Sequence, residues 1–552
     1  MFVRVKTTPN SPHKSVQIVS SERAGEKVRQ CIVRHVGVAL NDDELVRLKE
    51  LAEYIKANME HGHTPSLFKP DQLAQWAVEA CKKSEEQADK ELQVNLRQLR
   101  EENRIVVGIH DIYGKMFDEL GFNWATGNPS RRRQASKIIR HMVMARIANP
   151  TSKRGSVIDL GRDFGIKLNL TSVYRSMDYL DEKHIGFIQD KAWEVATGLF
   201  KEKIDVIFYD CTTLYFETVE EDHLRDKGYS KDMKFKQSQV LLALMVTRHG
   251  IPVGYRLYNG STFEGDTLAD IITDIEKHHH VNKVIFVADS AMFSDDNLKL
   301  IEKHKPYQYI VGARIKNQPE KIKKQILDIN SYEEREGIKY KQFILKNGRR
   351  LLVNYSEKRA SKDARDRQCT IDKLLKKLSK SKNPESFISN YGYRKYLRID
   401  GSQKVEINQN KIEEDARWDG LHGVITNMQE SHEEIFANYK GLWQVEETFR
   451  ITKHDLQTRP IFHWTPQRIQ AHVAICFMAL VCIRHMTYRV ALQYQPLSPE
   501  IIRNELVHTQ LSILQHQSTK QRYAIPSKPT QHARKIYQAM GKNLSAVPFP
   551  MD

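Results

Sequence analysis

The run Ile204-Asp205-Val206-Ile207-Phe208-Tyr209-Asp210 predicts a buried β-strand, because it is mostly β-branched and aromatic and too short for a helix. A second apolar run, residues 284–288, also ends in an acid, Asp289. Ligands of open α/β sheets bind where the strands emerge, so Asp210 and Asp289 would converge if their strands were neighbours. Either aspartate alone is more often a turn former or a helix cap.

The pattern around these two runs predicts an α/β fold. The order β-β-β-α-β-α-β is expected from strand 204–210, a hairpin of 240–246 and 251–258, helix 266–279, strand 283–289, helix 295–305 and strand 307–313. One more helix is expected to complete this mixed sheet with its helices. That helix follows only after residues 314–420, which are rich in Lys, Arg and turn residues and which we interpret as a β-rich basic insertion.

The expected helix holds a third acid. Tyr439, Leu442, Glu446 and Lys453 have offsets of 0, 3, 7 and 14, which on a helix place them within roughly 60° of one another on one face. A carboxylate framed by a phenol and an ammonium group suits a metal ion together with a phosphate. The neighbouring Glu447, about 100° round the helix, is the alternative to Glu446.

Three convergent carboxylates predict a metal site for phosphodiester chemistry. Oxygen ligands without Cys or His suit Mg²⁺, and Mn²⁺ as a substitute. Two such ions about 3.5 to 4 Å apart would activate the attacking oxygen and stabilise the leaving 3′-oxygen. We therefore expect Asp210, Asp289 and Glu446 to be both the catalytic residues and the metal ligands.

The composition favours a polyanionic partner and excludes several classes. The chain has 552 residues, 86 Lys plus Arg and 69 Asp plus Glu, which gives a formal charge of +17. Its six cysteines are scattered without metal-ligand spacing, as expected of reduced cytosolic thiols. The start of the chain lacks the features of a signal peptide, and the longest apolar run, 471–483, is too short for a membrane span. We expect a cytoplasmic protein that does not associate with membranes.

The periodicity divides the chain into seven parts. We expect an N-terminal β meander (1–40), a helical segment (41–105) and a helical, candidate DNA-binding domain (106–203), followed by the first part of the catalytic core (204–313), the insertion (314–420), the second part of the core (421–490) and a C-terminal helical tail (491–552). A charged connector helix is expected over 82–103. Residues 157–165 and 170–181 resemble a helix-turn-helix, in which Arg175 would enter the major groove, although any two short helices give this pattern.

The combined motifs resemble the DDE insertion-sequence transposases of ribonuclease-H-like fold, in the group with a Tyr-(2)-Arg-(3)-Glu-(6)-Lys signature and a β-rich insertion. The matching segments lie throughout most of the chain: 209–217, 259–264, 288–294, 358–363, 439–453, 459–463 and 468–472. The resemblance implies that Asp210, Asp289 and Glu446 are the metal-binding triad.

The same resemblance implies partners and DNA contacts. Tyr439 and Lys453 match signature positions that contact DNA phosphates, whereas Leu442 replaces the signature arginine, whose charge Arg450 could supply from the same helix face. Trp418 in the insertion could stack on an unpaired base, although core packing is the more common role of such an aromatic residue. The implied partner is double-stranded DNA, both transposon ends and target, bound by a homodimer or larger assembly at the nucleoid of a prokaryotic cell.

Two other functions remain open from the sequence. A ribonuclease-H-like nuclease or resolvase would keep the three acids without needing the Tyr-Glu-Lys stripe or the basic insertion. A domesticated DNA-binding protein without catalysis would be expected to have lost part of the triad, but all three acids are present.

Overall fold

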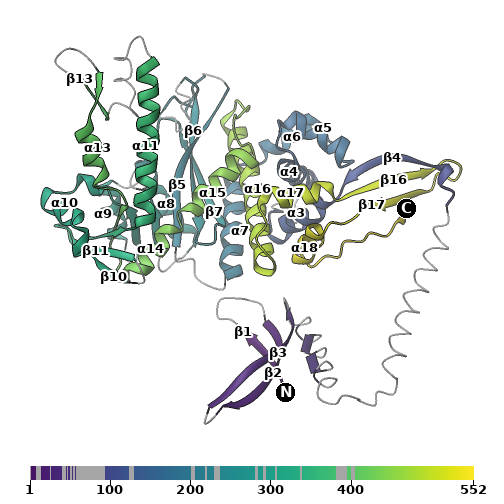
Figure 1. The fold of residues 1–552 in the computed structure, drawn as a ribbon. Coiled ribbons are helices and arrows are strands. Elements are labelled where there is room, and N and C mark those ends of the chain that lie inside the picture. Colours follow the sequence, from purple (N-terminus) through teal and green to yellow (C-terminus); the bar gives the residue numbers. More distant parts are fainter. Residues whose placement is uncertain are drawn as a thin grey trace. The chain divides into compact units, whose positions relative to one another are not determined.

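The computed structural model describes residues 2–7, 14–24, 27–39, 45, 48–49, 52–53, 56, 94–123, 130–200, 206–217, 220–228, 236–279, 284–289, 294–304, 307–335, 338–380, 395–399 and 405–551. The chain forms two compact units. One comprises residues 1–205, 212–261 and 446–552, and the other comprises residues 206–211 and 262–445. Each unit is described by itself below, and Figure 1 gives the element labels.

The N-terminal strands of the first unit form a three-stranded antiparallel sheet. β1 (Phe2–Thr7), β2 (Lys14–Ala24) and β3 (Lys27–Ala39) pair in the order β1-β2-β3. Val16 and Ile18 of β2 alternate toward a small core that Leu45 and Ala52 complete. The chain thus has an antiparallel β meander in the region where the sequence predicts one.

Most helices of the first unit lie in two stretches of the chain. They are α3 (Gly108–Glu119), α4 (Ser130–Ala148), α5 (Lys153–Asp163), α6 (Leu170–Asp178) and α7 (Glu182–Phe200), then α16 (Pro466–Gln493) and α17 (Pro499–His508). Among the described residues only α16 is long and apolar enough to cross a membrane, but 94% of its most apolar window is buried inside the protein. This burial is what a core helix shows, and α16 packs against α3, α4, α6 and α7.

A four-stranded sheet joins residues from both ends of the first unit. β4 (Leu99–Val106) pairs with β16 (Gln510–His516), which pairs with β17 (Arg522–Pro526) and through it with β18 (Phe549–Met551). Figure 1 shows β16 between β4 and β17. Two sequence-based predictions are wrong here. In the described part of the connector helix predicted over 82–103, residues 94–103, the chain instead forms a 3₁₀ turn (Leu96–Gln98) and the beginning of β4. The C-terminal tail, predicted as helical, contains three strands beside α17 and α18 (Gln531–Ala539).

Long-range pairing explains both errors. β4 is only weakly β-forming by itself, but each of its ends is paired with β16, from Val106 opposite Gln510 to Leu99 opposite His516. Such pairing overrides the local charge pattern, which favours a helix. The rest of the predicted helical segment 41–105, from residue 57 to 93, lies outside the described residues, as does most of 40–56.

The large mixed sheet has nine strands in the order β10-β11-β12-β15-β9-β8-β5-β6-β7. Its predicted strands are found as β5 (Val206–Tyr215), the hairpin of β6 (Gln239–Thr247) and β7 (Pro252–Asn259), β8 (Ile285–Ala288) and β9 (Gln308–Gly312). β8 pairs in parallel with both β5 and β9, whereas β6 and β7 are antiparallel. The two predicted helices between the parallel strands are α8 (Leu268–His279) and α9 (Asp295–Lys303).

The predicted insertion, in the second unit, is less β-rich than expected. Its strands β10 (Glu333–Arg335), β11 (Ile338–Ile344) and β12 (Arg350–Tyr355) extend the large sheet through β15 (Leu421–Thr426), and β13 (Leu397–Ile399) pairs with β14 (Val405–Ile407). Helices in its described residues are α10 (Glu320–Leu327), the 24-residue α11 (Glu357–Lys380) and α13 (Gln409–Ala416). The basic residues at the start of α11, which suggested a turn, are good helix formers, and the helix buries Ile371 and Leu374 three residues apart.

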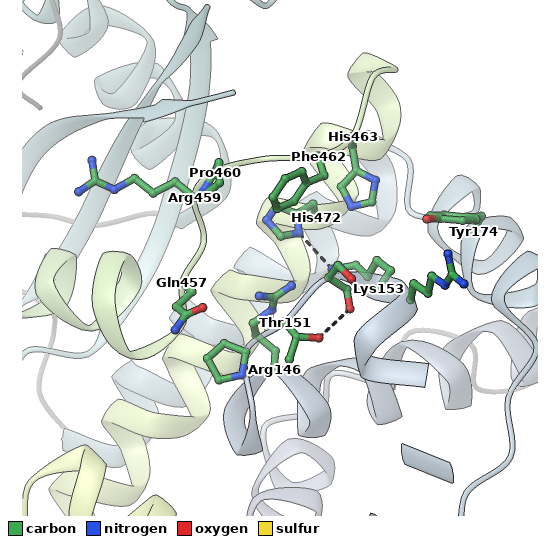
Figure 2. Close-up of a pocket in the computed structure, with 13 residues that line it drawn as sticks. Arg146, Thr151, Lys153, Tyr174, Gln457, Arg459, Pro460, Phe462, His463 and His472 are labelled. Carbon is green, nitrogen blue, oxygen red and sulfur yellow. Dashed lines mark hydrogen bonds between the residues drawn. The ribbon is translucent and has the colours of Figure 1, made fainter. Parts of the chain in front are cut away.

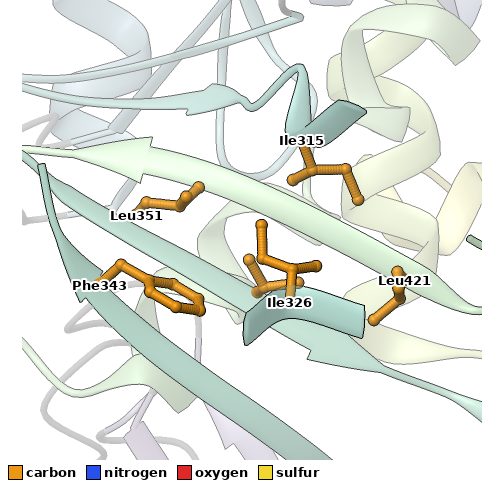
Figure 3. Packing of buried hydrophobic residues seen from close by; sticks show 6 residues of the cluster. Ile315, Ile326, Phe343, Leu351 and Leu421 are labelled. Carbon is orange, nitrogen blue, oxygen red and sulfur yellow. The ribbon is translucent and has the colours of Figure 1, made fainter. Parts of the chain in front are cut away.

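An apolar cluster fixes the insertion to the large sheet. Ile326 of α10 and Leu351 of β12 are fully buried and pack with Phe343 and Leu421 (Figure 3). Burying side chains of this size contributes about 1.5–3 kcal/mol each. The strands beside β9 are therefore held by a core of their own.

Candidate functional site

Asp210 and Asp289 occupy equivalent positions on neighbouring parallel strands of the second unit. The register pairs Val206 with Ile285 and Phe208 with Val287, and the two aspartates lie two residues further along each chain. Adjacent strands are about 4.8 Å apart, and residues two apart point to the same face. The convergence that the sequence predicts between these two carboxylates is therefore consistent with the strand register.

The two aspartates differ in their surroundings. Asp210 lies within β5 and is half-buried, and its Oδ1 accepts a hydrogen bond of 2.8 Å from the backbone N–H of Cys211. Asp289 directly follows the last residue of β8 and is exposed. A carboxylate held by the backbone next to an exposed one gives a site with one fixed and one accessible acid.

Cys211, beside Asp210, is not a nucleophile in this structure. Its thiol is buried with the hydroxyl groups of Tyr209 and Thr267, which are hydrogen-bonded to each other. Burial raises the pKa of Cys211 to about 12. The thiol is therefore protonated at neutral pH.

His422 is a residue of this region that the sequence analysis missed. It lies on β15, and its ring centroid is 5.1 Å from that of Tyr439. Burial, and then the charge of Arg359, lower the pKa of His422 to about 4, while Asp289 acts in the opposite direction. The neutral ring thus packs beside Tyr439 and is close enough to Asp289 for the charge of that carboxylate to act on its pKa. The available signal was a polar residue within the apolar strand.

The expected signature helix is not continuous, which corrects the prediction. Tyr439 lies at the end of α14 (His432–Lys440), Glu446 lies on α15 (Trp443–Arg450), and Lys453 lies in the π-helical segment Ile451–Asp455. Between α14 and α15 the N–H groups of residues 441, 442, 444 and 445 bond to carbonyl groups three residues back. The 100° rotation per residue on which the common face was based therefore does not apply across this link.

Gly441 lies in the link between α14 and α15, close to a buried side chain of β5. A Cβ atom at position 441 would lie 2.3 Å from Cζ of Phe208, a buried side chain of β5. Glycine is therefore required for the close approach of this link to the strand that carries Asp210. The sequence contained this signal, but the prediction placed the glycine inside a helix.

The two neighbouring glutamates of α15 differ in their bonding. Glu447 accepts hydrogen bonds of 2.8 Å from both Nε and Nη2 of Arg450, and this bonding lowers the pKa of Glu447. Glu446 is exposed, and no hydrogen bond or ion pair holds its carboxylate among the residues that the structure describes. Of the two, Glu446 has the carboxylate that is accessible to a ligand.

The remaining predicted DNA-contacting residues are distributed over both units. In the first unit Lys453 is half-buried, and Arg175 is exposed on α6, whose first turn Asn169 caps with a hydrogen bond of 2.8 Å. α5 and α6 are present where the helix-turn-helix was predicted, and Arg468 of α16 holds Asp178 of α6 with bonds of 2.7 and 2.8 Å. In the second unit Trp418 is half-buried against the apolar cluster.

A divalent metal ion bound by side chains requires several ligand groups close together. In the described part of the chain, no group of three or more His, Cys, Asp or Glu side chains lies close enough together to hold a metal ion. Asp210 and Asp289 nevertheless supply oxygen ligands from equivalent positions on adjacent strands of one unit, and Glu446 belongs to the other unit. Paired carboxylates of this kind fit Mg²⁺ or Mn²⁺.

Comparison with known families identifies the chain. The model of the family described as "Transposase DDE domain" matches residues 201–482, which is just over half of the sequence. The chain belongs to this family. The matched segment includes Asp210, Asp289 and Glu446, and the mixed α/β sheet is the architecture that the matched segment builds.

Comparison with solved structures gives distant similarities. A piggyBac transposase synaptic complex with hairpin DNA is 10% identical, with a TM-score of 0.38, and the alignment covers 72% of this chain and 76% of that chain. A Mos1 transposase paired-end complex with the left transposon end is 11% identical, with a TM-score of 0.15 and coverage of 33% and 60%. No curated protein matched the sequence. The family assignment therefore depends on the DDE domain match.

Proposed function

We propose that this DDE transposase cuts double-stranded DNA at transposon ends and joins the freed 3′ ends to target DNA, with Mg²⁺ held by Asp210, Asp289 and Glu446. The observation that carries the proposal is the register of β5 and β8, which places two of these acids at equivalent positions on neighbouring strands. The family match and the accessible carboxylate of Glu446 support it. When bound, divalent ions would activate the attacking oxygen and stabilise the leaving one.

The fold is proposed to be ribonuclease-H-like, in the insertion-sequence group with the Tyr-Arg-Glu-Lys signature. The sheet order β7-β6-β5-β8-β9, with α8 and α9 connecting the parallel strands, supports the expected β-β-β-α-β-α-β connectivity. The segment between β9 and β15 is the proposed insertion. Its mixture of helices and strands, together with Leu442 in place of arginine, sets this chain apart from the group's pattern.

Some residues of the chain are proposed to bind DNA phosphates, apart from those proposed for the cleavage chemistry. Tyr439 and Lys453 are proposed to bind phosphates next to the scissile bond, with Arg450 in the role of the missing arginine. Arg450 uses Nε and Nη2 for Glu447, and its Nη1 lies 3.4 Å from Oδ2 of Asp455. The second hydrogens of Nη1 and Nη2 are the donors proposed for a phosphate oxygen. The protonated thiol of Cys211 is consistent with cleavage that forms no covalent enzyme intermediate.

DNA binding is proposed to extend beyond the carboxylates and to involve a homodimer or larger assembly on DNA. The net charge of +17 and the exposed Arg175 on the second helix of the α5–α6 pair support a DNA surface in the first unit. Trp418 is proposed to stack on a base. This would require its ring to leave the apolar cluster against which it packs. We propose that the enzyme acts in the cytoplasm, at the nucleoid of a prokaryotic cell.

The experiment that tests this function compares substitutions in one DNA cleavage and strand-transfer assay with Mg²⁺. Asp210→Asn, Asp289→Asn and Glu446→Gln should each abolish cleavage and spare DNA binding, whereas Glu447→Gln serves as the matched control. Binding of Mn²⁺ to the protein, measured by calorimetry without DNA, should weaken in the Asp210→Asn and Asp289→Asn variants. Cleavage that survives any of the three substitutions would refute the assignment of that residue.

The same assay separates the alternative functions. Cleavage of many DNA sequences without joining to a target would indicate a nuclease or resolvase. Binding without cleavage by the unaltered chain, with Mg²⁺ or Mn²⁺ present, would indicate a domesticated DNA-binding protein.

A further inference from the structure

A pocket of about 160 Å³ lies in the first unit and contains none of the proposed metal ligands. Its walls come from the end of α4, the beginning of α5, the loop at residues 457–463 and the first turns of α16 (Figure 2). Four cationic side chains line it (Arg146, Lys153, Arg154 and Arg459), and no Asp or Glu is among the residues that line it.

Two of these cations are buried without an acidic partner in the described chain. Arg146 and Lys153 are each only 4% exposed. The Arg146 Nε atom has no hydrogen-bond partner among the described residues, and Nη1 makes one long bond of 3.4 Å to the carbonyl of Leu456. A buried guanidinium group with unused donors is costly unless an acceptor satisfies it.

Lys153 donates to a histidine that is itself fixed. His472 Nε2 lies 3.0 Å from the carbonyl oxygen of Thr458, an acceptor only, so this nitrogen carries the proton. Burial keeps the pKa of His472 well below its usual range, so Nδ1 is unprotonated and accepts from Lys153 Nζ at 3.1 Å. Figure 2 shows this bond as a dashed line. An ammonium group has three donors, and this bond uses one of them.

The beginning of α5 adds further donors to the same pocket. The Ser152 side chain caps the N–H of Gly155, and no acceptor is recorded in the described chain for the N–H groups of Lys153 and Arg154. Helix N-termini carry partial positive charge and bind anions. Burial, and then the charge of the nearby Arg146, lower the pKa of Lys153 to about 7.

We propose that this pocket binds one phosphate group, with Arg146 and Lys153 as its buried ligands and Arg154 with the first turn of α5 at its opening. The group is either a backbone phosphate of DNA or a free phosphate, since both present the same tetrahedral oxygens. If the phosphate group belongs to DNA, the inference rests on the proposed function. If it is a free phosphate, the inference does not.

The first arm of the test uses sulfate as the probe, without DNA. Sulfate binding is measured by calorimetry on the full chain, with chloride at equal ionic strength as the reference. Lys153→Met should weaken binding at least tenfold, Lys153→Arg should retain most of it, and Lys528→Met, an exposed cation outside the pocket, should leave it unchanged. Arg154→Gln, at an exposed position, should weaken it several-fold and answers the question if Lys153→Met fails to fold.

The second arm distinguishes the two sources of phosphate. A duplex of random sequence is titrated at several salt concentrations, and the slope of log affinity against log salt is compared among the same variants. One lost phosphate contact should reduce the slope by about 1. A smaller slope for Lys153→Met and Arg154→Gln assigns the pocket to the DNA backbone, and loss of sulfate binding with an unchanged slope assigns it to a free anion.

The proposal is overturned if sulfate affinity and salt slope are the same in all variants as in the unaltered chain. This failure is distinct from failure of the proposed function, because the sulfate arm needs neither DNA nor Mg²⁺. Loss of the proposed function would appear instead as cleavage that survives Asp210→Asn.

Discussion

Arg450 holds Glu447 through two hydrogen bonds of 2.8 Å, one from Nε and one from Nη2. This pair leaves the adjacent Glu446 as the exposed carboxylate of α15. We therefore predict that Glu446→Gln lowers Mg²⁺-dependent cleavage at least about 100-fold, since it removes a metal ligand, and that Glu447→Gln lowers it less than about 10-fold. Cleavage rates at matched DNA occupancy check this. Equal losses in the two variants would contradict it.

Arg450 is predicted to contribute to DNA binding more than to stability. Its side chain is 47% exposed, so loss of the pair in Arg450→Gln should lower the free energy of unfolding by less than about 1 kcal/mol. If its free donors bind a phosphate, the salt slope of DNA binding should fall by about 1. Glu447→Gln is the control, because it breaks the same pair and keeps the cation. An unchanged slope in Arg450→Gln would exclude Arg450 as the replacement for the signature arginine.

Gly441→Ala is predicted to destabilise the second unit. The added Cβ would lie 2.3 Å from Cζ of the buried Phe208, so the link between α14 and α15 must shift, at a cost of about 1–3 kcal/mol. Denaturant unfolding measures the cost. Gly186→Ala within α7 is the matched control, since nothing lies within 4 Å of its added Cβ, and there the change should stabilise by roughly 0.5–1 kcal/mol. Phe208→Leu combined with Gly441→Ala should recover part of the loss, and no recovery would mean that Phe208 is not the obstacle.

Lys153 is predicted to make stability rise with pH above neutrality. Its pKa is about 7 in the folded chain against a usual 10.5, so between these values the unfolded chain binds the additional proton and stability increases by up to about 1.4 kcal/mol per pH unit. The groups whose charges act on it are Arg146, which stays charged, and the thiol of Cys476. The neighbouring His463 and His472 stay neutral because burial lowers the pKa of each. Subtracting the pH profile of Lys153→Met isolates this contribution. Saturating sulfate should make the difference between the two stability profiles independent of pH. If the difference does not depend on pH even without sulfate, the pKa of Lys153 is not lowered by burial.

The sequence was most informative where local pattern and final environment agree. The apolar run that ends at Asp289 and the hairpin before it were predicted close to their observed positions, because strands buried on both faces are nearly continuous in apolar residues. The end predicted at Asp210 is wrong, because β5 continues to Tyr215 and Asp210 lies within the strand. The long apolar run at residues 471–483 lies within α16, and its burial there agrees with its continuous apolar composition.

The errors share a different physical origin. The single signature helix failed because Gly441 is needed for contact with Phe208, which lies more than two hundred residues away in the sequence. The cationic pocket was missed because Lys153 and His472 are 319 residues apart, and each alone resembles an ordinary helix residue. Features that depend on such contacts have no local pattern from which they could be predicted.

The pairing of β4 with β16 has a consequence for how the protein is made. The partner of β4 begins about 400 residues later in the chain, so at roughly 5–20 residues per second the ribosome needs on the order of 20–80 s to synthesise it. During that time Leu99–Val106 offers an unpaired strand edge to the cell. A nascent chain that stalls before residue 510 cannot complete this sheet, so the sheet assembles only after β16 has been synthesised.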